Sequence, residues 1–192
     1  MKRALVTGGS GGIGAAICRR LAADGHHVVV HARRNVDVAQ ALVREIAAAG
    51  ASAEAIAFDV ADRAAAAAVL ATLLEDGPIQ ILVNNAGIHA DAVFPGMSGA
   101  QWDSVLDVSL NGFFNVTQPL TLPMLRTRWG RIINITSVAA LAGNRGQVNY
   151  SAAKGALHAA TKSLALELAS RCLLYTSPST RDGLLSRMPS SA

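Results

Sequence analysis

Three side chains in the second half of the sequence have the types and the spacing needed for chemistry on a carbonyl group: Ser137, Tyr150 and Lys154. Tyr150 and Lys154 are four residues apart in a stretch with helical character, so both are expected on one helix face. An ammonium beside a phenol favours the phenolate, and we expect it to lower the pKa of Tyr150 below its ordinary value of about 10. A phenol tuned in this way can donate a proton to a carbonyl oxygen and take it back. The pattern indicates reductase chemistry.

Ser137 ends an apolar run that begins at residue 130. This run predicts a serine at the carboxyl edge of a strand, where open α/β sheets bind ligands. Taken alone, however, the three residues are better explained as a surface Tyr–Lys pair on an amphipathic helix and a strand-end serine, because short motif matches carry a false-positive risk. The beginning of the chain reverses this balance.

The chain begins with a short apolar strand, a glycine cluster and a helical pattern. Gly8 permits a tight turn after the strand, Gly12 lets the backbone approach a pyrophosphate, and Gly14 allows the helix to pack closely on the sheet. A helix beginning near Ile13 would direct its amino-terminal amides at the phosphates. A second apolar run at residues 26–34 completes the βαβ arrangement that this fingerprint requires. The sequence therefore predicts a dinucleotide-binding site.

The end of this second run bears on the choice between the two nicotinamide cofactors. A carboxylate there would bind the 2′-hydroxyl of NAD and repel a 2′-phosphate, but the sequence has His31, Arg33 and Arg34 instead. Because arginine forks match phosphate oxygens, we predict NADP(H), with Arg33 or Arg34 on the 2′-phosphate. The alternative is that both arginines are solvated loop charges. No His/Cys cluster has metal-ligand spacing, so we predict no catalytic metal.

Apolar runs alternate with helical stretches along the chain, which predicts an α/β fold with a Rossmann-like, doubly wound parallel sheet in a single domain. The composition, 51% hydrophobic and only 4% aromatic, predicts an aliphatic, alanine-rich core. The expected strands lie at residues 4–8, 27–32, 53–60, 79–87 and 131–137.

Together these motifs resemble the short-chain dehydrogenase/reductase family, most closely its 3-oxoacyl-acyl carrier protein reductases, over about residues 3–172. The cofactor loop is Thr7-Gly8-x3-Gly12-x-Gly14, an adenine contact is Asp59-Val60, and a strand-stabilising segment is Asn84-Asn85-Ala86-Gly87. Ser137, Tyr150 and Lys154 match the family's catalytic residues. The cofactor-binding residues that we expect are Thr7, Gly8, Ser10, Gly12, Ile13, Gly14, Arg33, Arg34, Asp59, Val60, Asn85, Ala86, Gly87, Tyr150 and Lys154.

The resemblance implies NADPH-dependent reduction of a 3-oxoacyl thioester, bound to acyl carrier protein, to its 3-hydroxyacyl form in fatty-acid-type synthesis. Ser137 and Tyr150 would hydrogen-bond the developing oxyanion, Tyr150 would give its proton, and Lys154 would hold the nicotinamide ribose. Arg128 and Arg171 fall where related reductases present basic residues to the acidic carrier, although a solvated surface explains both arginines equally well. The family also implies a homodimer or tetramer for a complete chain.

One position departs from the family pattern. A helical Asn-Leu-x-Gly segment in the family supplies an asparagine that holds a proton-relay water, and here Ser109 replaces it in Ser109-Leu110-Asn111-Gly112. We expect Ser109 to take this fourth catalytic role through its shorter hydroxyl, or the relay to run differently. Asn111 is a poor replacement, since residues two apart face different sides of a helix.

The remaining features exclude several other classes of protein. The net charge of +4 is too small and too dispersed to indicate nucleic-acid binding. No apolar run reaches the roughly 18 residues of a membrane span, and no signal peptide precedes the first strand, so we expect a cytoplasmic protein. Cys18 and Cys172 both lie in helical contexts and are expected as reduced thiols without a disulfide framework.

The carboxyl terminus breaks the agreement with the family, whose members continue into further strands and a substrate-covering segment. Residues 173–192 contain five serines and two prolines without a helix or strand period, which predicts disorder. We expect an incomplete domain at residues 1–172 that lacks the family's last strands, followed by a tail of foreign sequence, with a genuine divergent tail as the alternative. The function therefore stays open between the oxoacyl reductase, a non-catalytic NADP-binding fragment, and an enzyme of another ketone or alcohol.

Overall fold

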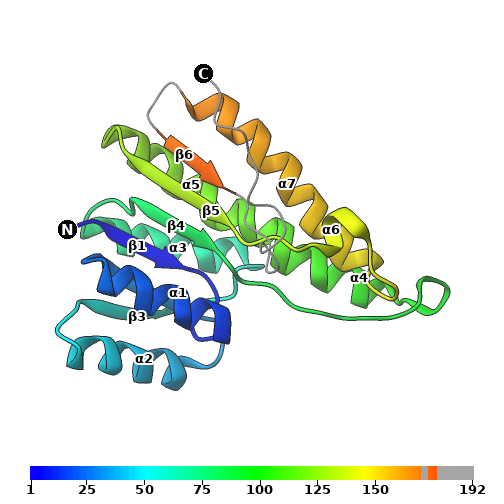
Figure 1. Cartoon of the computed structure of the whole chain (residues 1–192), viewed down its shortest axis with the longest axis horizontal. Coiled ribbons are helices and arrows are strands. Elements are labelled where there is room, and N and C mark those ends of the chain that lie inside the picture. The colour runs from blue at the N-terminus through cyan, green and yellow to red at the C-terminus, as the bar shows by residue number, and fades with distance from the viewer. Residues whose placement is uncertain (170–172, 177–192) are drawn as a thin grey trace.

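The computed structural model describes residues 1–169 and 173–176. Its centre is a parallel six-stranded sheet in the order β3-β2-β1-β4-β5-β6 (Figure 1). The strands are β1 (Arg3–Val6), β2 (His27–Ala32), β3 (Ala53–Ala57), β4 (Ile81–Asn84), β5 (Gly130–Asn134) and β6 (Leu173–Thr176). The predicted α/β class and doubly wound parallel sheet are confirmed.

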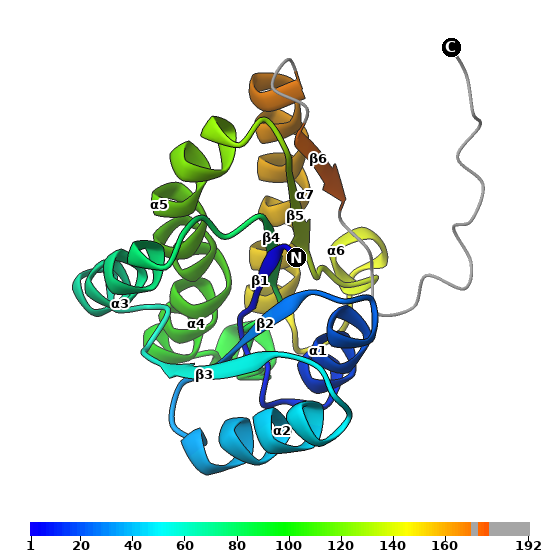
Figure 2. The same ribbon diagram turned by 90° about the vertical axis from the view of Figure 1, so that its left-hand side faces the viewer.

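Helices connect the strands and cover both faces of the sheet (Figure 2). The longer ones are α1 (Gly12–Ala23), α2 (Val36–Ala48), α3 (Arg63–Glu75), α4 (Gly99–Leu106), α5 (Gly112–Arg126) and α7 (Val148–Leu168). The shorter ones are η1 (Phe94–Gly96), the π-helical turn η2 (Asp107–Asn111) and α6 (Ala139–Ala142). Within the described part of the chain, none of these helices combines the length and the apolar character needed to cross a membrane.

Successive residues of each central strand contribute to two different cores. Leu5, Val29, Leu82 and Ile132 pack on the face covered by α3, α5 and the end of α7. The opposite face, covered by α1 and α2, holds Ala4, Val6, Val28, Val30, Ile81 and Val83. Because helices bury both faces, these strands have apolar residues on both sides, which explains why the sequence shows apolar runs instead of strict alternation.

The strand order positions the ligand-binding edge. The chain passes from β1 outward to β2 and β3 and then crosses back to β4, so the two connections that leave β1 and β4 diverge at the carboxyl ends of these neighbouring strands. Such a topological switch point is where open α/β sheets bind ligands.

The last strand corrects one expectation from the sequence. Residues 173–192 were predicted to be disordered, but Leu173–Thr176 pair in parallel with β5, in a register that runs from Gly130↔Leu173 to Ile133↔Thr176. The prediction is wrong for these four residues, because an edge strand offers unpaired backbone groups and can recruit a segment too short to show a period. Residues 170–172 and 177–192, with Arg171, Cys172 and the expected foreign tail, lie outside the described residues.

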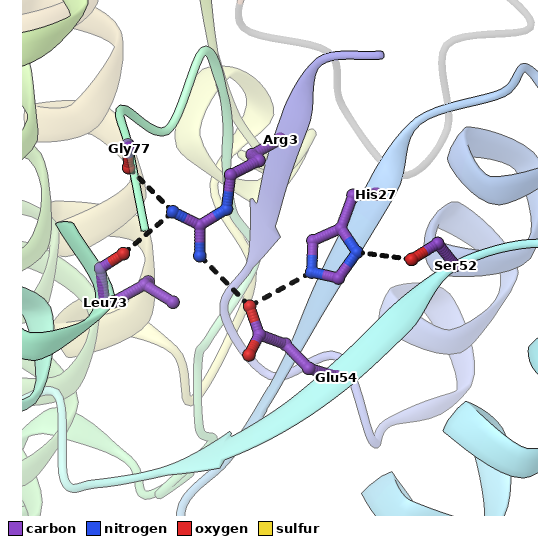
Figure 3. A network of polar contacts seen from close by, with 6 residues as sticks. All are labelled: Arg3, His27, Ser52, Glu54, Leu73 and Gly77. Atoms are coloured by element: carbon purple, nitrogen blue, oxygen red, sulfur yellow. Dashed lines mark hydrogen bonds and ion pairs between the residues drawn. The ribbon is translucent and has the colours of Figure 1, made fainter. Parts of the chain in front are cut away.

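The amino-terminal edge of the sheet is closed by a polar network that connects three neighbouring strands (Figure 3). Arg3 Nη2 and His27 Nε2 both contact Glu54 Oε1, at 3.1 and 3.0 Å. Burial opposes ionisation of Glu54, but the hydrogen bonds from His27 and Arg3 outweigh it and hold the pKa of this carboxyl below its ordinary value. The other partners are Ser52 Oγ, 2.7 Å from His27 Nδ1, and the carbonyl oxygens of Leu73 and Gly77, which accept from Arg3 Nη1 at 2.8 and 2.7 Å.

Candidate active site

A cleft of about 630 Å³ opens at the carboxyl edge of the sheet and extends to the first turns of α7. It brings together most of the residues that the sequence predicted for the cofactor. These are Gly8, Ser10, Gly12, Ile13, Gly14, Arg33, Arg34, Asp59, Val60, Asn85, Ala86, Gly87, Tyr150 and Lys154. Residues that line the cleft and that the predicted set lacked are Gly11, His31, Asn35, Ile88, His89, Val108, Ile135 and Thr136.

The glycines after β1 have the local geometry that the fingerprint requires. Gly8 has a φ of +63°, which side chains other than glycine rarely adopt. A Cβ on Gly14 would lie 2.2 Å from the Gly8 carbonyl oxygen, so α1 packs directly against this turn. A Cβ on Gly12 would meet nothing within 4 Å, which leaves bare backbone facing the cleft. The first turn of α1 is therefore accessible to a ligand with phosphate groups.

Thr7 does not line the cleft, but its hydrogen bonds hold together the two turns that border the cleft. Its Oγ accepts hydrogen bonds from the backbone N–H groups of Asn85 and Ala86, both at 3.0 Å. The Asn85 amide donates in return to the carbonyl oxygens of Thr7 and Gly8, at 3.0 and 3.1 Å. These bonds tie the turn after β1 to the turn after β4 on the two sides of the switch point.

Two arginines stand at the cleft end formed by β2 and β3. Arg33 Nη2 pairs with Asp59 Oδ2 at 2.7 Å, while its side chain stays 47% exposed. Arg34 is exposed and lines the same part of the cleft. Since one carboxylate faces two guanidinium groups here, the mouth carries a net positive charge that suits an anionic ligand.

The three residues with potential carbonyl chemistry meet at the other end of the cleft. Tyr150 and Lys154 lie in the first turns of α7, and Ser137 follows β5. All three are buried, and the Ser137 hydroxyl lies near enough to the Tyr150 phenol to act on its pKa. The Ser137 Oγ is also held by the N–H of Ala139, at 3.2 Å. The predicted proximity of the serine and tyrosine hydroxyls is thus present in the fold.

The predicted effect of Lys154 on the phenol is not found. Burial raises the pKa of Tyr150, the Ser137 hydrogen bond acts against this, and the charge of Asp91 adds to it. Lys154 Nζ instead donates to the Ile135 carbonyl oxygen at 2.8 Å, and burial lowers the pKa of this ammonium to about 8. The expectation of a lowered tyrosine pKa is wrong here: Lys154 Nζ lies 5.8 Å from the centroid of the Tyr150 ring, and desolvation of the phenol is the largest effect on its pKa.

The match to known proteins decides the family. A family model described as short chain dehydrogenase matches residues 2–174. This chain belongs to the short-chain dehydrogenase family. Its members are oxidoreductases that bind a nicotinamide dinucleotide, and we assign the chain to this class of enzyme.

Curated relatives give the same assignment in more detail. The chain is 46% identical over 169 residues to the 3-oxoacyl-(acyl-carrier-protein) reductase FabG of Aggregatibacter actinomycetemcomitans, an alignment of 87% of this chain and 70% of the relative. It is 46% identical over 171 residues to nodulation protein G of Azospirillum brasilense, and 44% identical over 171 residues to the FabG reductase of Staphylococcus aureus strain Mu50. Each of these two alignments covers 88% of this chain and 70% of the relative.

Asn149 is a positioning residue of this short-chain dehydrogenase that the sequence did not reveal. Its side chain is fully buried, and its Nδ2 donates to the carbonyl oxygens of Ala90 and Gln101, both at 3.0 Å. Its Oδ1 accepts from the Tyr150 N–H at 2.8 Å. Asn149 therefore anchors the start of α7 to the loop at Ala90 and to the first turn of α4, and nothing in its sequence context distinguished it from a helix-start residue.

His89 is a second residue that the sequence analysis missed. Its ring stacks on Tyr150 with 4.3 Å between centroids, and its Nδ1 lies 4.0 Å from Asp91 Oδ1. The available signal was its place directly after the segment at residues 84–88, which turns from β4 into the cleft. His89 and Asp91 therefore contribute to the polar surroundings of the tyrosine.

Ser109 lies apart from the cleft. It sits in η2, is 3% exposed, and its Oγ has no hydrogen-bond partner within the described residues. It lines a separate cavity, about the size of one water molecule, together with Thr7, Asn84 and Leu157. Asn111 Nδ2 donates outward to Asp107 Oδ1 at 2.7 Å, as expected of a residue on another side of the helix. The catalytic role of Ser109 stays a prediction.

The sequence analysis also made predictions about metal ions, about the cysteine thiols and about basic residues that would contact acyl carrier protein. Within residues 1–169 and 173–176, no group of three His, Cys, Asp or Glu side chains has an arrangement that holds a metal ion. Cys18 is a buried free thiol, and burial raises its pKa to about 12. Arg128 is exposed in the turn before β5, at the edge of the sheet opposite the cleft.

Proposed function

We propose that this short-chain dehydrogenase reduces a 3-oxoacyl thioester on an acyl carrier protein to the 3-hydroxyacyl form, with NADPH as the hydride donor. The observation that carries the proposal is the neighbouring, buried Tyr150 and Ser137 hydroxyls at one end of a cleft whose other end holds Arg33 and Arg34. The reductases from Aggregatibacter and Staphylococcus support the substrate class.

The cleft fits a dinucleotide on its own features. The N-cap of α1 is Gly11, whose lack of a side chain leaves the first amides of the helix without a side-chain cap. Gly12 presents bare backbone beside it, and the helix N-terminus favours negative charge. Gly8, Gly12 and the α1 amides would hold the pyrophosphate, and Lys154 and the turn at Gly87 would border the nicotinamide end. The bound cofactor supplies the hydride.

The side chains at the catalytic end divide the work on the ketone. Tyr150 donates its phenolic proton to the oxygen as negative charge develops there, and the Ser137 hydroxyl hydrogen-bonds the same oxygen. A raised tyrosine pKa keeps the phenol protonated and ready to donate at neutral pH. Lys154, held by the Ile135 carbonyl, supplies positive charge near the phenolate that remains after transfer.

Turnover is tested by following the loss of NADPH absorbance with an acetoacetyl group on acyl carrier protein, on coenzyme A, and with small ketones. The wild-type chain is expected to reduce the thioesters, and Tyr150→Phe to lose about 10³-fold in kcat/KM because the general acid is gone. NADPH binding without turnover would leave a cofactor-binding fragment. Turnover of small ketones alone would refute the thioester part of the proposal.

The choice of NADPH is tested at the cationic mouth. Arg34→Ala is expected to raise KM for NADPH by about tenfold, and Arg33→Ala by less, while both leave KM for NADH within about twofold, since a 2′-phosphate loses a charge-assisted hydrogen bond. Arg33 is expected to show the smaller effect, because Asp59 already occupies part of its fork. Equal effects on both cofactors would refute a 2′-phosphate contact. The matched control is Arg44→Ala, an exposed arginine on α2 that does not line the cleft.

A further inference from the structure

His31 forms a connection across the carboxyl edge of the sheet that no known role of the cleft explains. The residue lies near the end of β2, between β1 and β3, and only 2% of it is exposed. The Gly8 N–H donates to its Nδ1 at 3.0 Å, and its Nε2 lies 3.0 Å from the Phe58 carbonyl oxygen. One side chain therefore joins the turn after β1 to the segment after β3.

The two partners determine the protonation state of the imidazole. A backbone N–H can only donate, so Nδ1 must be unprotonated, and a carbonyl oxygen can only accept, so Nε2 must carry the proton. Burial lowers the pKa of His31 to about 4, against the opposing effects of the Phe58 carbonyl and of the Asp59 charge. The neutral ring with its proton on Nε2 thus satisfies both bonds throughout the neutral range.

The hydrogen bonds of His31 lie just beyond the last backbone pairs that join β2 to β1 and β3. The β1–β2 register stops at Val6↔Val30, two residues before Gly8, and the β2–β3 register stops at Ala32↔Ala57, directly before Phe58. Beyond these pairs the turns after β1 and β3 diverge around the cleft. Both turns line it, through Gly8 on one side and Asp59 on the other.

We infer that His31 is a positioning residue of the cofactor site, which holds the glycine turn and the Asp59 segment at a set separation so that the adenosine half of the cleft is formed before the dinucleotide binds. The inference rests on the proposed binding of NADP(H). His31 itself needs no contact with the cofactor, because it acts through Gly8, Phe58 and the neighbouring pair of Arg33 with Asp59.

Three substitutions separate the two bonds. Asn at this position places an acceptor where Nδ1 stands and keeps the bond from Gly8, whereas Gln places a donor where Nε2 stands and keeps the bond to Phe58. Leu keeps neither. We expect His31→Leu and His31→Gln to weaken binding of 2′,5′-ADP and to raise KM for NADPH by about tenfold or more, with kcat within about twofold, because an unpaired Gly8 N–H misplaces the phosphate turn. His31→Asn should recover only part of the affinity, because it keeps the bond from Gly8 but loses the connection to Phe58.

The readouts distinguish this role from a purely structural one and from failure of the proposed function. If wild-type protein binds neither 2′,5′-ADP nor NADPH, the proposed function and the inference fall together. If wild-type protein binds both and all three folded variants bind equally well, the role of His31 alone is overturned. Thermal unfolding identifies variants that do not fold. The inference is also overturned if the loss of cofactor affinity is proportional to the loss of thermal stability among the variants and His31→Asn recovers none of that affinity.

Discussion

The two edges of the sheet use polar residues in opposite ways. At the amino edge, Arg3, His27 and Glu54 pair with one another and with nearby carbonyls, so the charges satisfy each other (Figure 3). At the carboxyl edge, glycines replace side chains in the turn after β1, and Arg34 and the first amides of α1 face a cleft. One sheet therefore separates stability from binding. Polar groups that bond one another at the amino edge hold strands together, whereas groups that face the cleft at the carboxyl edge keep their hydrogen-bonding capacity for a ligand.

The histidines of β2 show the same contrast within one strand. His27 at the amino end bonds side chains, Ser52 and Glu54, which are themselves part of the closed network. His31 at the carboxyl end bonds only backbone groups, of Gly8 and Phe58, and so controls where two loops stand. Substitutions at each edge test whether the two networks have separate roles.

After the loss of the Tyr150 phenol, removing the Ser137 hydroxyl at the open edge should have the largest effect on kcat/KM. Ser137→Ala is expected to lower kcat/KM by about 10²- to 10³-fold, because one donor to the developing oxyanion is lost. Steady-state kinetics with a 3-oxoacyl thioester measure it. The control is Ser104→Ala on α4, whose hydroxyl donates to the Gln101 carbonyl away from the cleft and whose loss should leave the kinetics unchanged. Similar rates for Ser137→Ala and wild type would remove Ser137 from the catalytic set.

Two glycines of the open edge should respond to alanine in different ways. Gly14→Ala is expected to cost about 3 kcal/mol of unfolding free energy, since its Cβ would lie 2.2 Å from a backbone oxygen. Gly12→Ala meets open space, so its stability should stay within about 0.5 kcal/mol of wild type while NADPH affinity falls about tenfold or more. Denaturant titration and ligand titration measure the two quantities. A stable Gly14→Ala variant would contradict the packing described above.

The burial of Lys154 predicts a pH dependence of stability. The folded-state pKa of about 8 lies below the unfolded value of 10.5, so between these values the unfolded chain binds more protons and stability rises with pH. Relative to Lys154→Met, wild type should gain on the order of 3 kcal/mol across this window. Denaturant titrations of both proteins at several pH values test this. A difference that stays constant with pH would show that the ammonium is not desolvated.

The smallest effect is expected at the closed edge. Glu54→Gln should lose about 1 kcal/mol of stability, because it weakens the hydrogen bonds from Arg3 and His27 that are made to a partly exposed carboxylate. Its kcat/KM should equal that of wild type, since Glu54 is at the far edge from the cleft. A change in kcat/KM without a change in stability would show that the two edges are coupled.

Much of the site was predictable because its signals are local. The glycine spacing after β1 and the four-residue separation of Tyr150 and Lys154 constrain backbone geometry within one turn or one helix, and the fold preserves both. The doubly wound parallel sheet followed from the alternation of elements. These features depend on near neighbours in the chain, which the sequence displays directly.

Other features depend on residues that are distant in the chain. Asn149 joins α7 to the loop at Ala90 and to helix α4 at Gln101, and β6 pairs with a strand some forty residues earlier. The direction of the Tyr150 pKa shift was predicted wrongly, because desolvation depends on what covers the ring. No local pattern contains this information.

The amino-acid sequence was enough to predict the doubly wound sheet and the types of residue available for catalysis, because these follow from period and spacing, and its motifs carried the resemblance to the family. Only the tertiary structure decided which polar groups close on one another and which stay open, and which ring nitrogen of His31 carries the proton. Hydrogen bonding and burial are relations between segments brought together by folding. They give identical residue types, such as the two histidines of β2, different physical roles.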